Sequence, residues 1–292
     1  MSENQATKLE ELLKGEKKLH STKFIAITSG KGGVGKSTIS ANLAYTLAKM
    51  GYKIGVFDAD IGLANLDLIF GVRAKQNILH VLRGELNFDD IIIPIDKNLY
   101  LIPGDSGEEI LKYADKFNIL DNFANESLVF EAFDYVIVDT GAGIGNTTQA
   151  FLNASDHVIV ITTPDPSAIT DAYATIKINS RYKDEMLMII NMATRKQEAL
   201  NIFNKIQSIA QKNFPHLSLL NLGNFLADNV VRNSTKYREL ITKAEPYNSF
   251  SLTMEEIAKQ LISKVEHNVL ETPKANFGSF LKRMLSLSLI HI

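Results

Sequence analysis

The sequence has 292 residues, of which 45% are hydrophobic and 22% charged, with 31 basic and 33 acidic side chains. This length and apolar fraction suffice for one large globular core. The absence of cysteine excludes disulfides, thiolate metal sites and cysteine nucleophiles. The start of the chain lacks a signal-peptide core and no apolar run reaches about 18 residues, so we expect a cytoplasmic protein.

Residues 1–21 are polar and charged, with a weak helical stripe of Leu9, Leu12 and Leu13. Apolar residues three and four apart are typical of a short docking helix, and a frayed terminal tail is the alternative. We predict that this segment is separate from the domain that follows.

From residue 22 onward, continuous apolar runs alternate with helical segments. The predicted strands are Phe24–Thr28, Lys53–Phe57, Leu99–Ile102, Tyr135–Val138, His157–Ile161, Met186–Ile190 and Leu217–Leu222. The predicted helices are Ser37–Met50, Ser106–Phe117, Asn146–Ala154, Ile169–Ser180, Thr194–Lys212 and Leu252–Val269. This alternation indicates an α/β fold, a mostly parallel doubly wound sheet with helices on both faces. We assign residues 22–270 to this domain and residues 271–276, which include Pro273, to a linker.

The clearest motif is a glycine-rich loop between the first predicted strand and its helix. Its spacing is that of a phosphate-binding loop, in which glycines let backbone N–H groups surround phosphate oxygens at a helix N-terminus. We expect Lys36 to reach the β- and γ-phosphates and the Ser37 hydroxyl to ligate Mg²⁺. The residues predicted to hold the nucleotide are Gly30, Lys31, Gly32, Gly33, Val34, Gly35, Lys36, Ser37 and Thr38.

Three carboxylates follow predicted strands and complete this site. Asp58 and Asp60 come after the second strand, and Asp139 ends the fourth. The carboxyl ends of parallel strands border the crevice in which α/β proteins bind ligands. We therefore predict that Asp58 and Asp139, together with Ser37, hold Mg²⁺ beside the nucleotide.

Lys31 is an additional lysine directly after the first glycine of the loop. With this deviant Walker A loop, the stretch from about residue 22 to 268 resembles the MinD/ParA family. The resemblance implies an ATPase whose two subunits close face to face around ATP, with Lys31 crossing to the phosphates of the opposite subunit. A second cation at the γ-phosphate would stabilise charge in the transition state, in agreement with that role.

The resemblance also assigns two switch segments. Asp58–Asp67 is similar to the first switch, in which Asp60 orients the attacking water. Val138–Gly143 is similar to the second switch, whose backbone senses the γ-phosphate. Residues expected to contact nucleotide on this basis are Gly141 and Gly143, and, at the adenine, Asn191.

Within this family, three segments are similar to the FlhG branch, which controls the number and placement of flagella. They are Thr163–Tyr173, Gly145 after the second switch, and the N-terminal Asn4–Leu9. In that branch the N-terminal element stimulates an FlhF-type GTPase through a glutamine, which corresponds to Gln5 here. Components of the flagellar C-ring are further partners that the resemblance allows.

Other functions stay open at this point. A MinD-type division-site regulator is the first alternative, and its N-terminal residues would be dispensable. A ParA-type partition protein would bind DNA, which the near-neutral charge disfavours. A metabolic P-loop enzyme is a third possibility, although the sequence has no substrate-pocket motif.

Residues 277–292 form a separate segment that begins as an amphipathic helix. At about 100° per residue, its large apolar side chains share one face and its cations the other. This pattern suits a helix lying on an anionic membrane surface, and two such helices on a dimer would bind together. We therefore predict attachment to the inner face of the cell membrane in the ATP state; a helix packed on the protein's own core is the alternative. The residues assigned to membrane contact are Phe277, Phe280, Leu281, Lys282, Arg283, Met284 and Leu285.

Overall fold

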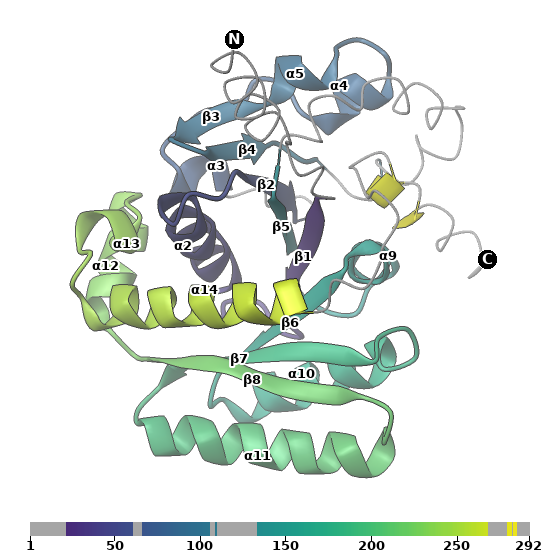
Figure 1. The fold of residues 1–292 in the computed structure, drawn as a ribbon, viewed down its shortest axis with the longest axis vertical. Coiled ribbons are helices and arrows are strands. Elements are labelled where there is room, and N and C mark those ends of the chain that lie inside the picture. Colours follow the sequence, from purple (N-terminus) through teal and green to yellow (C-terminus); the bar gives the residue numbers. More distant parts are fainter. Residues whose placement is uncertain are drawn as a thin grey trace, which may run out of the picture.

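The computed structural model describes residues 22–60, 66–105, 109, 133–267, 279–281 and 283–284. Within these residues, one sheet of eight strands has the order β3-β4-β2-β5-β1-β6-β7-β8 (Figure 1). Every strand pairing is parallel except that of β3 with β4, which confirms the predicted α/β class. The strands are β1 (Lys23–Thr28), β2 (Ile54–Ala59), β3 (Ile93–Asp96), β4 (Leu99–Ile102), β5 (Tyr135–Thr140), β6 (His157–Thr162), β7 (Glu185–Ala193) and β8 (Ser218–Leu226).

The central strands are buried along almost their whole length, as the continuous apolar runs predict. β3 is the strand that the sequence analysis missed. It is a short antiparallel edge strand that contains Pro94, a residue without an N–H group for a sheet interior. Strand register places Asp58 of β2 opposite Asp139 of β5, so two of the predicted site carboxylates lie on neighbouring strands.

Helices cover both faces of the sheet (Figure 1). On one face, α2 (Lys36–Lys49), α13 (Ile241–Ala244) and α14 (Ser249–His267) share a core with β1 and its neighbours. On the other face lie α9 (Asn146–Ala154), α10 (Pro166–Asn179) and α11 (Lys196–Asn213), with the short α4 (Ile78–Leu82) and α5 (Phe88–Ile91). The short helices α3 (Leu66–Ile69) and α12 (Asn229–Tyr237) border the carboxyl end of the sheet. The helix predicted at Ser106–Phe117 lies outside the described residues apart from residue 109, which is helical.

The C-terminal helical residues 279–281 and 283–284 pack on the protein's own core. Phe280, Leu281 and Met284 are at most 2% exposed, and the Phe280 ring stacks on that of Phe24 with a centroid distance of 4.4 Å. The Arg283 guanidinium donates to Asp156 at 3.0 Å. In this conformation the apolar face assigned to the membrane is buried in the protein's own core, so membrane contact stays a prediction and would require this helix to leave the core. The conformation is that of a terminal helix docked on the core, which the sequence analysis gave as the alternative.

Several predicted segments lie outside the described residues. These are the N-terminal segment 1–21 with Gln5, the first-switch residues 61–65, the linker 271–276, and Phe277, Lys282 and Leu285. Among the residues that are described, no helix is both long enough and apolar enough to cross a bilayer.

Candidate nucleotide-binding site

The phosphate loop lies between the end of β1 and the start of α2, as predicted. Gly35 precedes α2 with φ +88°, and a Cβ there would lie 2.4 Å from Asn191 Nδ2. Gly30 packs directly on the backbone of α10, where an added Cβ would lie 2.2 Å from the carbonyl carbon of Asp171. Both positions therefore require glycine, one for its conformation and both for close approach.

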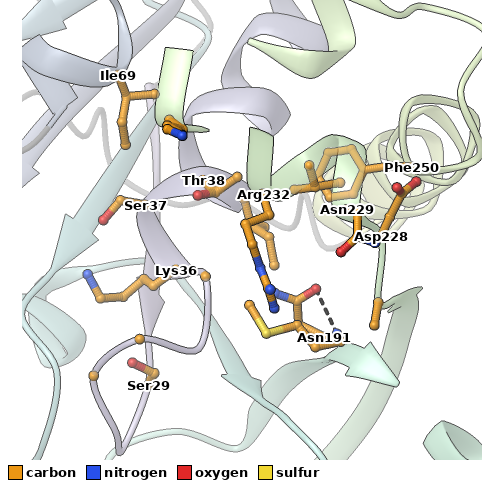
Figure 2. Close-up of a pocket in the computed structure, with 18 of the residues that line it drawn as sticks. Ser29, Lys36, Ser37, Thr38, Ile69, Asn191, Asp228, Asn229, Arg232 and Phe250 are labelled. Atoms are coloured by element: carbon orange, nitrogen blue, oxygen red, sulfur yellow. Dashed lines mark hydrogen bonds between the residues drawn. The ribbon is translucent and has the colours of Figure 1, made fainter. Parts of the chain in front are cut away.

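A pocket of about 1110 Å³ opens at this loop (Figure 2). Lys36, Ser37 and Thr38 lie at one side of it, and Asp228, Asn229 and Phe250 lie at the other. Its position at the carboxyl end of a parallel sheet is the usual place for ligands in this fold class. The remaining lining residues are Ser29, Gly32, Gly33, Gly35, Ile39, Asp60, Leu68, Ile69, Ala142, Asn191, Met192, Leu226, Ala227, Val231, Arg232, Lys236 and Arg238.

The Lys36 ammonium lies among the predicted carboxylates. Its Nζ is 3.3 Å from Asp139 Oδ1 and 3.6 Å from Asp60 Oδ2, and both Lys36 and Asp139 are buried. The structure thus brings together Lys36, Asp60 and Asp139, as the sequence analysis expected. A buried cation of this kind is available to exchange its carboxylate partners for phosphate oxygens.

Asp58 lies opposite Asp139 on the neighbouring strand and also contacts residues of the predicted first switch. Burial, and then the negative charge of Asp139, raise the pKa of the Asp58 carboxyl to about 7. Its oxygens accept backbone N–H groups of Leu66 at 3.1 Å and Asp60 at 3.4 Å. Asp58 therefore holds both described ends of the predicted first switch, and a cation placed here would favour its ionised form.

The arrangement fits Mg²⁺. Asp139 Oδ2 is buried and has no hydrogen-bond partner among the described residues, so one carboxylate oxygen is left for a further ligand. No cluster of three or more His, Asp or Glu side chains in the described part of the chain could enclose a metal by itself. Mg²⁺ typically takes one or two protein carboxylates, water and substrate phosphates, which matches Ser37, Asp58 and Asp139 beside a nucleotide.

Lys31 has partners within its own chain. Its ammonium contacts Asp165 Oδ1 at 3.2 Å and also the Ser167 hydroxyl. Asp165 is the N-cap of α10, and hydrogen bonds from Ser167, Ala168 and Lys31 hold the pKa of its carboxyl well below the usual range. The contact joins positions 134 residues apart, so sequence spacing gave no sign of it.

The second switch and Asn191 are also tied to the phosphate loop. Gly143 donates its backbone N–H to the Ser29 carbonyl at 2.8 Å. Asn191 Nδ2 donates to the Val34 carbonyl at 2.8 Å, and Asn191 Oδ1 accepts the Met192 N–H at 2.9 Å. The contacts of Gly141 and Gly143 with a γ-phosphate, and of Asn191 with adenine, stay predictions.

The far wall of the pocket was not predicted. Asp228, Asn229 and Arg232 come from the end of β8 and from α12. Figure 2 shows the Arg232 side chain extending from α12 toward Asn191. α12 carries few apolar residues, and no motif marks it in the sequence, so only the folded chain places it at the site.

Comparison with known proteins gives concordant results. The chain matches the ParA family, described as "NUBPL iron-transfer P-loop NTPase", over residues 20–262. It is 53% identical over 288 residues to the flagellum site-determining protein YlxH of Helicobacter pylori, covering 97% of this chain and 98% of that protein. It is 31% identical over 247 residues to the antiactivator FleN of Pseudomonas aeruginosa, covering 84% and 88%. The MinC:MinD cell division complex of Aquifex aeolicus contains a chain with TM-score 0.66 and 27% identity, covering 87% of this chain and 100% of that one.

Proposed function

Because this chain belongs to the ParA/MinD family of P-loop ATPases, we propose that it is an ATP-driven, membrane-cycling switch that regulates the number and placement of flagella. The observation that carries this proposal is the buried Lys36 at the phosphate loop of a chain so similar to a flagellum site-determining protein. The similarity extends over 97% of this chain, so it reaches beyond the ATPase domain.

Nucleotide binding begins with Lys36. Its ammonium exchanges Asp139 and Asp60 for oxygens of the β- and γ-phosphates, which also accept charge-assisted hydrogen bonds from lysine. Ser37, Asp58 and Asp139 would hold Mg²⁺, which would supply positive charge to neutralise the phosphates. Asp60, released from Lys36, is then available to orient the attacking water.

Dimerisation requires a second exchange. Lys31 leaves Asp165 and Ser167 and reaches the phosphates of the opposite subunit. The added cation stabilises negative charge in the transition state, so hydrolysis depends on the dimer. Asp165 keeps its helix-capping bonds to Ser167 and Ala168 after Lys31 has left.

Membrane attachment requires release of the docked C-terminal helix. Phe280, Leu281 and Met284 cannot be buried in the core and in a lipid surface at once. In the proposed cycle they dock in the nucleotide-free or ADP state and contact anionic lipid in the ATP dimer. The protein then sits peripherally on the inner face of the cell membrane while ATP is bound.

The partner side of the proposal rests on residues 1–21. We assign this segment the stimulation of an FlhF-type GTPase, with Gln5 as the activating side chain. Components of the flagellar C-ring are further partners of the same proposal.

The first experiment tests the flagellar role in cells. Deletion of the gene should change flagellar number or position, and the wild-type protein should restore both. Lys36→Ala should fail to restore them because ATP is not bound, and Asp60→Ala should accumulate at the membrane because ATP is not hydrolysed. Normal flagella in the deletion strain would refute the flagellar role.

The second experiment tests the GTPase partner. A peptide of residues 1–21 is added to an FlhF-type GTPase, with a Gln5→Ala peptide as the matched control. A rise in GTP hydrolysis that the Gln5→Ala peptide does not produce is expected. No rise, together with misplaced division in the deletion strain, would favour a MinD-type regulator instead.

A further inference from the structure

Ser40 of α2 contacts one of the proposed metal-site carboxylates from behind. Its hydroxyl lies 2.8 Å from Asp139 Oδ1 and 3.1 Å from the Lys36 carbonyl, and the side chain is fully buried. We propose that Ser40 is a positioning residue: it fixes the Asp139 carboxylate so that Oδ2 faces Mg²⁺ when Lys36 has moved to phosphate. This inference rests on the metal site of the proposed function.

The two oxygens of Asp139 have different surroundings. Oδ1 accepts from Ser40 and Lys36, whereas Oδ2 is buried with no partner among the described residues. A hydroxyl that donates to a carboxylate makes a charge-assisted bond, which is short and directional. The donor on Oδ1 therefore selects the rotamer of the carboxylate and leaves Oδ2 as the oxygen for a new ligand.

Ser40 becomes more important once nucleotide binds. Lys36 also holds Oδ1, at the longer distance of 3.3 Å, and its ammonium is the group that the proposed mechanism moves to the phosphates. Ser40 has no such second task, because its hydroxyl lies three residues beyond Ser37 in the interior of α2. Among the described residues, Ser40 is then the donor that remains on Asp139 Oδ1.

The same helix offers a matched comparison. Thr46 also carries a buried hydroxyl in α2, and this hydroxyl donates to the Asn42 carbonyl, four residues back, at 2.8 Å. The Ser40 hydroxyl lies in the corresponding position, 3.1 Å from the Lys36 carbonyl, but it has Asp139 Oδ1 as its nearer acceptor at 2.8 Å. Unlike Ser40, Thr46 makes no bond to a site carboxylate within the part of the chain that the structure describes. Thr46→Ala therefore shows how much the removal of a buried helix hydroxyl alone changes the Mg²⁺ dependence of nucleotide binding.

The test is the Mg²⁺ dependence of nucleotide binding by the full chain. Binding of a fluorescent ATP analogue is followed while MgCl₂ is added after treatment with EDTA. Mutation of a residue that hydrogen-bonds to a metal ligand typically lowers the metal affinity by about 10- to 100-fold. Ser40→Ala should therefore raise the half-saturating Mg²⁺ concentration by that factor. Ser40→Cys keeps the side-chain size but has only a weak donor, and it should behave like Ser40→Ala.

Two controls separate positioning from packing. Thr46→Ala should leave the Mg²⁺ titration unchanged, and Ser40→Ala should add nothing to an Asp139→Ala variant. A wild-type protein that binds the analogue equally well without Mg²⁺ would refute the proposed metal site itself. Two outcomes would overturn the role of Ser40 while leaving the metal site intact. In one, the wild type needs Mg²⁺ but Ser40→Ala and Ser40→Cys have the same half-saturating Mg²⁺ concentration as the wild type. In the other, Thr46→Ala raises this concentration as much as Ser40→Ala does.

Discussion

The ion pair between Asp156 and Arg283 is the most direct place to weaken docking of the C-terminal helix without changing the helix. Asp156 Oδ1 accepts from Arg283 at 3.0 Å, and Asp156 Oδ2 accepts the backbone N–H of Phe24 at 2.8 Å. An asparagine has one acceptor oxygen and can satisfy one of these donors. In Asp156→Asn we therefore expect the Arg283 contact to be lost while all apolar contacts of Phe280 stay in place.

The magnitude follows from exposure. A hydrogen bond between charged groups contributes roughly 1.5–3 kcal/mol when buried, and an exposed ion pair about 0.2–1 kcal/mol. The side chains of Arg283 and Asp156 are 39% and 15% exposed, so we expect an intermediate value. About 1 kcal/mol, discounted for solvent screening, corresponds to roughly a five-fold larger undocked fraction.

Limited trypsin digestion in ADP measures that fraction. Cleavage after Lys282 or Arg283 requires the undocked helix, and its rate follows the open population when reclosing is fast. Asp134→Asn is the matched control, because Asp134 accepts the Lys53 N–H at 2.7 Å in the same way as Asp156 accepts that of Phe24. Cleavage of Asp156→Asn at the wild-type rate, or an equal increase in Asp134→Asn, would show that the ion pair does not hold the helix.

Three further changes are predicted. Asp58 has a pKa raised from 3.8 to about 7, so the unfolded chain releases this proton at lower pH than the folded chain does. The unfolding free energy of the nucleotide-free protein should therefore fall as the pH rises from about 4 to 7, by at most about 4 kcal/mol, and Asp58→Asn should flatten this profile in denaturant titrations. Gly30→Ala should lower the unfolding free energy by roughly 1–3 kcal/mol because its Cβ meets the α10 backbone, whereas Gly32→Ala, with open space, should not; equal denaturation midpoints would contradict this. Asp165→Asn keeps an N-cap on α10 but removes the ion pair with Lys31, so Lys31 should be released more easily and the ATP-dependent dimer should become a few-fold tighter. Analytical ultracentrifugation measures this, and a weaker dimer would argue against release of Lys31.

Local chemistry explains what the sequence predicted well. The phosphate loop, its strand and its helix are adjacent in the chain, and their residue types directly reflect the geometry of phosphate binding. Strand ends were less accurate: β7 continues through Asn191 to Ala193, and β8 passes a register shift at Gly223 to reach Leu226. In β7 the apolar run is interrupted by Asn191, which lines the pocket, and in β8 it is interrupted by Gly223 and Asn224.

Contacts between distant segments could not be predicted. The partners of Lys31 and of Asp139 come from other elements, and only strand register and helix packing bring them together. For the C-terminal helix, an apolar face opposite cations fits a lipid surface and a protein core equally well. The pattern of Phe280, Leu281 and Met284 therefore could not distinguish the two, and their burial decides for this conformation.

The most direct test of the proposed switch is sedimentation of the wild-type protein with anionic vesicles in ATP and in ADP, both with Mg²⁺. We expect the protein to pellet with vesicles in ATP and to stay in the supernatant in ADP, with Lys36→Ala in the supernatant in both. Equal pelleting in the two nucleotides would contradict coupling between the phosphate loop and the docked C-terminal helix.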